Sequence, residues 1–362
     1  MIPMKLSLPL LHLAFVIAVS HSRLWAQPAV QQMYAHCINV GQGDATLIEF
    51  PCGAVLIDAG AQDDDAADHL VRYLKAFFQR RTDLIQTLEA VYITHPHKDH
   101  TFALKRVFQN FTVKRLVENG QDYGSGIASV RWARRHALTN HVAIRTVINS
   151  EVMKGGNREG LTDEVIDPLF CTKCDPKIAV LSGQWDQNPG WPKKEFENNN
   201  NHSLVIRVEF GESSLMFTGD LEEDAIKSFL GYYEQGSSQT DVLDVDVYHV
   251  GHHGSHNATT EDWLAAMTPS IAVISVGQWD NGRGTKNPFT TWAYGHPRRT
   301  TIEMLGRKLT GKRSSSIQVN LGTASRRFFP VVVRKKIYAT AWDGDTTIRA
   351  SLNHEFEVSR NN

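Results

Sequence analysis

A cluster of histidines with one aspartate directly follows an apolar, strand-like segment in the first third of the chain. Residues 95–100 read His-Pro-His-Lys-Asp-His. A strand that ends in a short turn can bring the side chains of that turn to one point, and imidazole nitrogen and carboxylate oxygen are both good zinc ligands. His95 and His97 can face one metal ion, while Asp99 and His100 can face a second. The turn therefore predicts a metal site rather than a solvated loop.

This turn resembles the HxHxDH signature of the metallo-β-lactamase superfamily. Further landmarks of that superfamily follow the same order along the chain, namely Leu-Ile-Asp-Ala-Gly at 56–60, Phe-Thr-Gly-Asp at 217–220 and Gly-His-His-Gly-Ser at 251–255. A finer resemblance is to the hydrolase domain of ComEC-like competence proteins and its free-standing secreted relatives. It is carried by residues 40–45, by the Asn200-x-x-Ser203 pattern, by 252–255 and by 294–297. The resemblance runs from about residue 37 to the C-terminal segment at 336–351 and does not include the membrane channel of ComEC.

The resemblance implies an α+β fold, a four-layer αββα sandwich in a single domain that spans residues 27–362. Its cofactors would be two zinc ions, with manganese or iron as alternatives. The implied metal ligands lie in three turns and are His95, His97, Asp99, His100, Asp220 and His253. Asp220 would bridge the two ions. Either His252 or His253 could complete the second site, and we favour His253.

Other residues receive roles beside the metal ligands. Asp99, His252 and His296 are expected to take part in catalysis. Substrate contacts are expected from Asn200, Ser203, Ser255 and Tyr294. Asp44 and Asp58 either orient metal-binding histidines by hydrogen bonds or serve only as turn and strand-end residues. His202 is a further candidate ligand, but on a strand it would face away from Ser203, which favours a surface position.

The predicted reaction is hydrolysis by a hydroxide shared between two zinc ions. The chain has 38 Lys and Arg against 39 Asp and Glu, a formal net charge of −1, so no global basic excess indicates nucleic-acid binding. We expect a phosphodiesterase, acting on nucleic acid or on a phosphate ester of the phosphorylcholine type. A lactonase or β-lactamase acting on C–O or C–N bonds is the alternative, and a non-catalytic metal-binding protein is the second. Basic residues at 131–135 either contact phosphates or form a solvated helix face.

The N-terminal segment, residues 1–26, predicts a secretory signal peptide with cleavage near Ala26, because a positive start precedes an apolar stretch and small residues. An uncleaved anchor is the alternative. The mature chain is expected to be periplasmic or secreted and to contain no membrane-spanning segment. Export makes disulfides possible. Cys37 and Cys52 flank neighbouring strands, whereas Cys171 and Cys174 are expected to form a local disulfide or to stay as free thiols.

The remaining pattern mixes strands and helices without repeats. An acidic run at 63–65 is expected to cap a helix at 66–79. An irregular insert is expected at about 149–176. The C-terminal segment, 336–351, is expected to form a hairpin that turns at Asp343 and Gly344. Strands are expected at 36–40, 45–50, 54–58, 88–94, 178–182, 203–210, 213–218, 242–250 and 271–276, and further helices at 128–137, 221–233 and 299–308.

Overall fold

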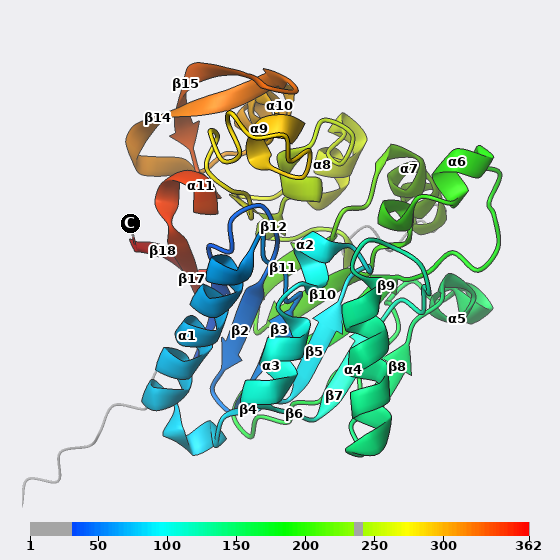
Figure 1. Cartoon of the computed structure of the whole chain (residues 1–362). Helices are drawn as coiled ribbons and strands as arrows, with labels where there is room; N and C mark the ends of the chain where they lie inside the picture. Colours follow the sequence, from blue (N-terminus) through cyan, green and yellow to red (C-terminus); the bar gives the residue numbers. More distant parts are fainter. Residues whose placement is uncertain (1–30, 235–241, 362) are drawn as a thin grey trace, which may run out of the picture. The chain divides into compact units, whose positions relative to one another are not determined.

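Two β-sheets form the framework of the protein (Figure 1). The computed structural model describes residues 31–234 and 242–361, so the predicted signal peptide lies outside the described residues. The first sheet has the strand order β18-β17-β1-β2-β3-β5-β7-β8, and the second has the order β16-β13-β12-β11-β10-β9. Two short pairs, β4 with β6 and β14 with β15, complete the strand pairing.

The strands of the first sheet are β1 (Gln32–Cys37), β2 (Thr46–Phe50), β3 (Gly53–Ile57), β5 (Ala90–Ile93), β7 (Arg115–Glu118), β8 (Ala143–Thr146), β17 (Asp345–Ser351) and β18 (Phe356–Asn361). The strands of the second are β9 (Lys177–Ser182), β10 (Val205–Phe210), β11 (Ser213–Phe217), β12 (Val247–His249), β13 (Ile271–Ile274) and β16 (Ile337–Ala339). The strands of the short pairs are β4 (Thr87–Leu88), β6 (Thr112–Val113), β14 (Lys312–Ala324) and β15 (Arg327–Lys335).

The α-helices are α1 (Asp64–Arg80), α2 (Lys98–Thr101), α3 (Leu104–Asn110), α4 (Ile127–Thr139), α5 (Asn149–Val152), α6 (Lys193–Phe196), α7 (Glu223–Tyr233), α8 (Glu261–Met267), α9 (Thr291–Tyr294), α10 (Arg299–Lys308) and α11 (Thr340–Asp343). The short 3₁₀ turns are η1 (Thr82–Leu84), η2 (Lys154–Gly156), η3 (Asn199–His202) and η5 (His252–Gly254). The expected acidic cap is present, because the Asp63 side chain accepts a hydrogen bond from the Ala66 backbone at the start of α1.

Alternating strand residues divide the interior into three apolar layers. Side chains from both sheets, such as Ile48 of β2 and Ile206 of β10, meet in the core between the sheets. Leu47, the neighbour of Ile48, points to the other face and packs in a core with Leu70 of α1, as the period of two along a strand requires. A third core holds Phe229 of α7 together with other helical residues and second-sheet side chains. The layers run helix, sheet, sheet, helix, and the predicted four-layer αββα sandwich is confirmed.

Parallel pairing sets where functional side chains can meet. In the first sheet β3, β5, β7 and β8 are parallel, and in the second β11, β12, β13 and β16 are parallel. All four residues of β5 are buried, as expected for a central strand covered on both faces. The carboxyl ends of parallel strands lie at one edge of a sheet, which is the usual place for ligand sites in such folds.

The C-terminal segment differs from the predicted hairpin. β16 pairs with β13 in the second sheet, whereas β17 pairs with β1 and β18 in the first. The chain crosses between the sheets through α11 and Gly344. Both segments read as strands in the sequence, but β13 and β1, with which they pair, lie far away along the chain, and only β18 is a near neighbour. The β14–β15 ribbon was not predicted.

The disulfide pairing also differs from the expectation. Cys52 is bonded to Cys171, across a sequence separation of 119 residues, and Cys37 and Cys174 are free. A pair between Cys37 and Cys52 is excluded by register, because Cys37 lies opposite Thr46 at the far end of β2 from Cys52. The predicted local bond between Cys171 and Cys174 is wrong.

The irregular insert at 149–176 contributes side chains to the protein interior. It contains α5 and η2, and its buried residues Ile166, Leu169 and Cys171 pack in the core between the two sheets. The Cys52–Cys171 bond ties this insert to the turn between β2 and β3. Across the ranges 31–234 and 242–361, none of the helices is both long and apolar enough to span a bilayer.

Candidate metal centre

The predicted metal ligands follow the carboxyl ends of three strands that belong to both sheets. His95 and His97 come directly after β5, and α2 then carries Asp99 and His100. The other candidate ligands come from the second sheet. They are Asp220, which follows β11, and His252 and His253, which form η5 after β12.

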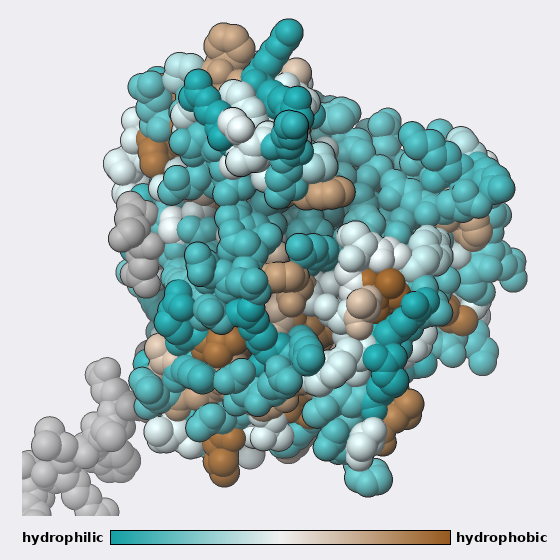
Figure 2. Space-filling view, in the orientation of Figure 1, coloured by the Kyte–Doolittle hydropathy of each residue, from teal (hydrophilic) through white to brown (hydrophobic). Residues whose placement is uncertain are grey.

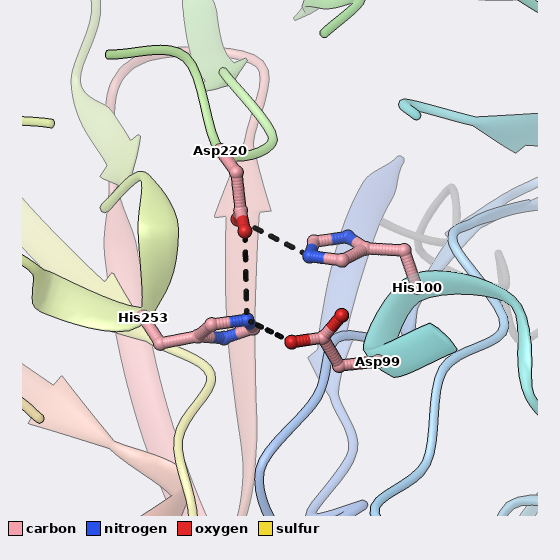
Figure 3. A group of neighbouring side chains, drawn as sticks. All are labelled: Asp99, His100, Asp220 and His253. Carbon is pink, nitrogen blue, oxygen red and sulfur yellow. Dashed lines mark ion pairs between the residues drawn. The ribbon is translucent and has the colours of Figure 1, made fainter. Parts of the chain in front are cut away.

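The side chains form two groups that share Asp220. The first group consists of His95, His97 and Asp220, and the second of Asp99, His100, Asp220 and His253. Within each group, one candidate ligand atom per residue lies within 4.8 Å of the others. The second group is drawn in Figure 3, where the four side chains point toward one another from α2, from the turn after β11 and from η5.

The contacts within the groups are close. His100 Nε2 lies 3.1 Å from Asp220 Oδ1, and His253 Nε2 lies 3.4 Å from Asp99 Oδ2. In the first group, His95 Nε2 lies 3.8 Å from Asp220 Oδ2. Among the described residues, Nε2 of His95, of His100 and of His253 is buried without a hydrogen-bond partner, and so is Oδ1 of Asp220. Buried polar atoms normally have a hydrogen-bond partner, so these four atoms are candidate ligand atoms for a cation.

Hydrogen bonds at Nδ1, on the side of the ring away from the two groups, fix the orientation of two imidazoles. His100 Nδ1 lies 2.7 Å from Asp58 Oδ2, and His253 Nδ1 lies 2.7 Å from the Ser275 carbonyl oxygen. In each case Nδ1–H is the donor, so Nε2 carries the lone pair that faces the group. Metal-binding histidines in proteins are held in this way by a carboxylate or a carbonyl.

Asp58 is itself held in place by the strand that supplies the histidine turn. Its carboxylate accepts hydrogen bonds from the Thr94 backbone and hydroxyl at 2.8 and 2.7 Å. The Asp44 carboxylate makes no hydrogen bond to a predicted metal ligand in the described part of the chain. It accepts a hydrogen bond from the Ser275 hydroxyl at 3.1 Å and lies 3.5 Å from His249. Asp58 therefore contacts a candidate ligand directly, whereas Asp44 acts on the strand that carries the Ser275 carbonyl.

Burial and the shared carboxylates shift the pKa values in opposite directions. Burial lowers the pKa of His95 well below its usual value, so His95 is neutral at pH 7. Burial also opposes a charge on His253, but Asp220 and Asp99 outweigh it and raise the pKa of His253 to about 9. The pKa of His100 is raised well above its usual value against burial, chiefly by Asp220 and Asp58. A divalent cation competes with these protons, because a metal-bound imidazole must be neutral.

A cavity of about 390 Å³ opens beside the two groups. Its lining includes several predicted site residues, namely His97, Asp99, Asn200, Asp220, His252, His253, Tyr294 and His296. His252 Nε2 lies 3.8 Å from Asp220 Oδ2 and 3.5 Å from Asn200 Nδ2. His296 is buried, and its ring lies 5.6 Å from that of His252 and 5.4 Å from that of Tyr294. Burial lowers the pKa of His296 well below its usual value, so this imidazole is neutral.

Three predicted positions differ in the structure. Ser203 is fully buried, and its hydroxyl accepts a hydrogen bond from the Asp220 backbone at 3.1 Å. Ser203 therefore lies behind the cavity wall and positions Asp220. Ser255 is also buried away from the lining, and its carbonyl accepts a hydrogen bond from Thr301. His202 lies in η3 and is buried, with its ring nitrogens on the Trp185 and Phe196 backbones, so the expected surface position is wrong.

Several residues of the site were not predicted. Glu222 accepts a hydrogen bond from Asn200 Nδ2 at 2.7 Å and lies 3.4 Å from His252 Nδ1. Its position two residues after Asp220 was the available signal. Ser275 offered none, because its backbone carbonyl makes the contact. Lys98 lies in the histidine turn itself and lines the cavity.

A sequence model of the metallo-β-lactamase superfamily matches residues 38–278. ComE operon protein 3 of Bacillus subtilis is 26% identical over 283 residues, which is 75% of this chain and 30% of that protein. Recombination protein 2 of Haemophilus influenzae is 25% identical over 248 residues, 67% of this chain and 24% of that protein. This chain thus spans less than a third of the length of either relative.

Among solved structures, the metallo-β-lactamase fold protein YhfI from Bacillus subtilis is similar to this chain. The match has a TM-score of 0.40 and 12% sequence identity, and it covers 78% of this chain and 94% of YhfI.

Proposed function

Since this chain belongs to the metallo-β-lactamase superfamily, we propose that it is a dinuclear zinc hydrolase that cleaves phosphodiesters. The observation that carries the proposal is the pair of His/Asp groups that share Asp220 at the wall of one cavity.

The donor set fits zinc. Zinc prefers imidazole nitrogen and carboxylate oxygen in compact sites, and each group contains at least two such atoms that lack a hydrogen-bond partner in the described part of the chain. His95, His97 and Asp220 would hold one ion, and Asp99, His100, Asp220 and His253 the other. When bound, the ions would supply a water of lowered pKa as the nucleophile and positive charge for phosphate oxygens. The first group has fewer protein ligands, which leaves it more open to substrate.

Other residues that line the cavity would bind and orient the phosphate. Lys98 and Tyr294 line it and can donate hydrogen bonds to non-bridging oxygens. The neutral imidazole of His296 can do the same. His252 is best placed to protonate the leaving oxygen, because its Nε2 faces Asp220 while Glu222 lies at its Nδ1.

A phosphodiester suits this cavity better than a lactam or lactone does. The lining offers several donors beside the two groups, and a phosphodiester presents to them two non-bridging oxygens that share one negative charge. We further infer that the chain is exported. The signal-like N-terminus and the Cys52–Cys171 disulfide both support an oxidising compartment.

The decisive experiment measures metal content and substrate class together. We expect the purified protein to hold about two zinc ions and to hydrolyse bis-p-nitrophenyl phosphate, with activity abolished by EDTA and restored by zinc. Single-stranded DNA and p-nitrophenyl phosphorylcholine would then distinguish a nuclease from an esterase. Turnover of nitrocefin or a lactone without diester hydrolysis would overturn the proposal. Bound zinc with no turnover in any class would indicate a metal-binding protein instead.

A further inference from the structure

Positive charge is concentrated in one stretch of the chain. Residues 281–342 contain 13 Lys and Arg but a single acidic residue, Glu303, although the whole chain has a net charge of −1. Four of these cations form ion pairs with carboxylates, namely Arg299, Arg307, Lys308 and Arg313. Within the described ranges the other nine form no ion pair with a carboxylate. This stretch is therefore a local exception to the balanced charge of the chain.

Four of the unpaired cations lie on two segments near the cavity. The 283–289 segment carries exposed Arg283 and Lys286 and ends at Phe289, which lines the cavity and is 68% exposed. The turn of the β14–β15 ribbon carries exposed Arg326 and Arg327. Figure 2 shows strongly hydrophilic side chains over the end of the molecule where Figure 1 places α9 and this ribbon.

Two hydrogen bonds to backbone carbonyls of α9 hold the ribbon turn against this helix. The Arg326 amide donates to the Trp292 carbonyl at 2.9 Å, and the Ser325 hydroxyl donates to the Ala293 carbonyl. α9 ends at Tyr294, which lines the cavity. The ribbon turn is thus fixed one short helix away from the site.

Aromatic rings lie between these cations. The Trp292 ring lies 5.5 Å from that of Phe328 and 6.0 Å from that of Trp279. The Arg283 guanidinium lies over both indoles, 5.2 Å from the Trp292 centroid and 5.6 Å from that of Trp279. None of these three rings is among the buried core residues. Cations interleaved with aromatic faces are typical of surfaces that bind single-stranded nucleic acid, where phosphates meet the cations and unpaired bases stack on the rings.

We propose that a basic–aromatic surface, made of Arg283, Lys286, Phe289, Trp292, Arg326 and Arg327, binds a single-stranded nucleic acid whose scissile linkage lies in the cavity. The proposal rests on the proposed phosphodiesterase function and assigns to it a binding surface outside the metal centre. The surface makes the substrate a polymer, since a small phosphate ester would fill the cavity without reaching the ribbon turn.

The test uses a double variant at the ribbon turn, Arg326→Gln with Arg327→Gln, in the zinc-loaded protein. A matched control, Arg72→Gln with Lys75→Gln, removes two exposed cations from α1 that form no ion pair within the described ranges. Binding is measured by fluorescence anisotropy with a labelled 20-nucleotide oligothymidylate that carries non-hydrolysable phosphorothioate linkages. Hydrolysis of bis-p-nitrophenyl phosphate is measured in parallel.

We expect the ribbon variant to bind the oligonucleotide roughly fivefold or more weakly than the wild type. The slope of log affinity against log salt should fall by about 1.4, because each lost phosphate contact on a single strand contributes about 0.7. Its hydrolysis of bis-p-nitrophenyl phosphate should match the wild type, and the control variant should keep both properties.

Unchanged oligonucleotide affinity in the ribbon variant, or an equal loss in the control, would overturn the assignment. So would ribbon-dependent binding to phosphatidylserine vesicles without ribbon-dependent oligonucleotide binding, since the surface would then be a membrane contact. Failure of the wild type to hydrolyse bis-p-nitrophenyl phosphate would instead count against the proposed function, because the binding data decide the surface separately.

Discussion

The Nδ1 atom of His100 donates a hydrogen bond of 2.7 Å to the Oδ2 atom of Asp58, and both side chains are fully buried. The bond directs His100 Nε2 toward Asp220 and raises the basicity of the ring. Supporting contacts of this kind change metal affinity without supplying a ligand.

The Asp58→Asn variant is therefore expected to fold and to bind zinc about 10–100-fold more weakly. Titration with a competing chelator measures this affinity. The exposed helix residue Asp65→Asn is the control and should bind zinc like the wild type. Unchanged zinc affinity in the Asp58 variant would show that this contact is only structural.

Asp220 belongs to both candidate groups, so its loss should affect both metal ions. We expect Asp220→Ala to retain less than one zinc per chain and to lose activity by roughly 100-fold or more. Metal analysis of the dialysed protein and the diester assay provide the two readouts. Full activity in this variant would contradict the assignment of the centre.

The neighbouring histidines of η5 are expected to respond differently. His253→Ala should lose zinc from the second group, because His253 Nε2 faces Asp99 and Asp220. His252→Ala should keep its zinc and lose turnover, because His252 faces the cavity beside Asn200. Each variant serves as the control for the other in metal analysis. Zinc loss in the His252 variant alone would reverse the two roles.

Glu49 should make stability depend on pH. Burial would raise the pKa of Glu49, but hydrogen bonds from His36, Arg80 and Arg81 outweigh it and hold the pKa well below the usual 4.5. A depressed pKa adds stability above the unfolded-state value, and that stability is lost as the pH falls toward the folded-state value. Below pH 4.5, each pH unit should remove about 1.4 kcal/mol of this contribution.

We expect Glu49→Gln to lower the free energy of unfolding at pH 7 by about 2–3 kcal/mol. The difference from the wild type should shrink between pH 4.5 and pH 3. Urea denaturation across this range measures it, with the exposed Glu164→Gln as the control. A difference that stays constant with pH would rule out the titration of Glu49 as its cause.

The disulfide pairing predicts a specific pattern of thiol reactivity. Cys174 should react with a thiol reagent in the native protein. Cys37 should react only after unfolding, because it is buried and burial raises its pKa to about 12. Replacing Cys52 and Cys171 together by Ala should destabilise the protein by about 2–4 kcal/mol, whereas Cys174→Ala should have little effect. Peptide mapping that joined Cys171 to Cys174 would contradict this pairing.

The sequence predicted the clustering of the candidate ligands where they are contiguous in the chain. Residues 95–100 hold four candidate ligands in one turn after an apolar strand, so local order alone brought them together. Asp220 and His253 were located by their motifs at strand ends, and the structure places both beside the histidine turn. Asp58 was also located by its motif at a strand end, and it lies beside the histidine turn because its strand β3 is parallel to β5 and ends next to it.

The sequence pattern did not predict features that depend on partners far away along the chain. Cys171 has a partner 119 residues away, and nothing near either cysteine indicates it. β16 and β17 look like the two arms of a hairpin, but strand pairing is chosen by distant neighbours. His202 was read as a strand residue, whereas it belongs to η3, where the turn directs its ring into the interior.

The placement of β17 beside β1 has a consequence for the order of events during synthesis. β1 lies between β2 and β17, so the first sheet contains strands from both ends of the described chain. A nascent chain can form the turn with His95 and His97 early, but Asp220 and His253 emerge more than a hundred residues later. The outer edge of β1 then stays open until residues 345–351 have been made. Capture of the proposed metal ions would thus be a late step, and a prematurely terminated chain would expose an unpaired strand edge that can pair with other chains and aggregate.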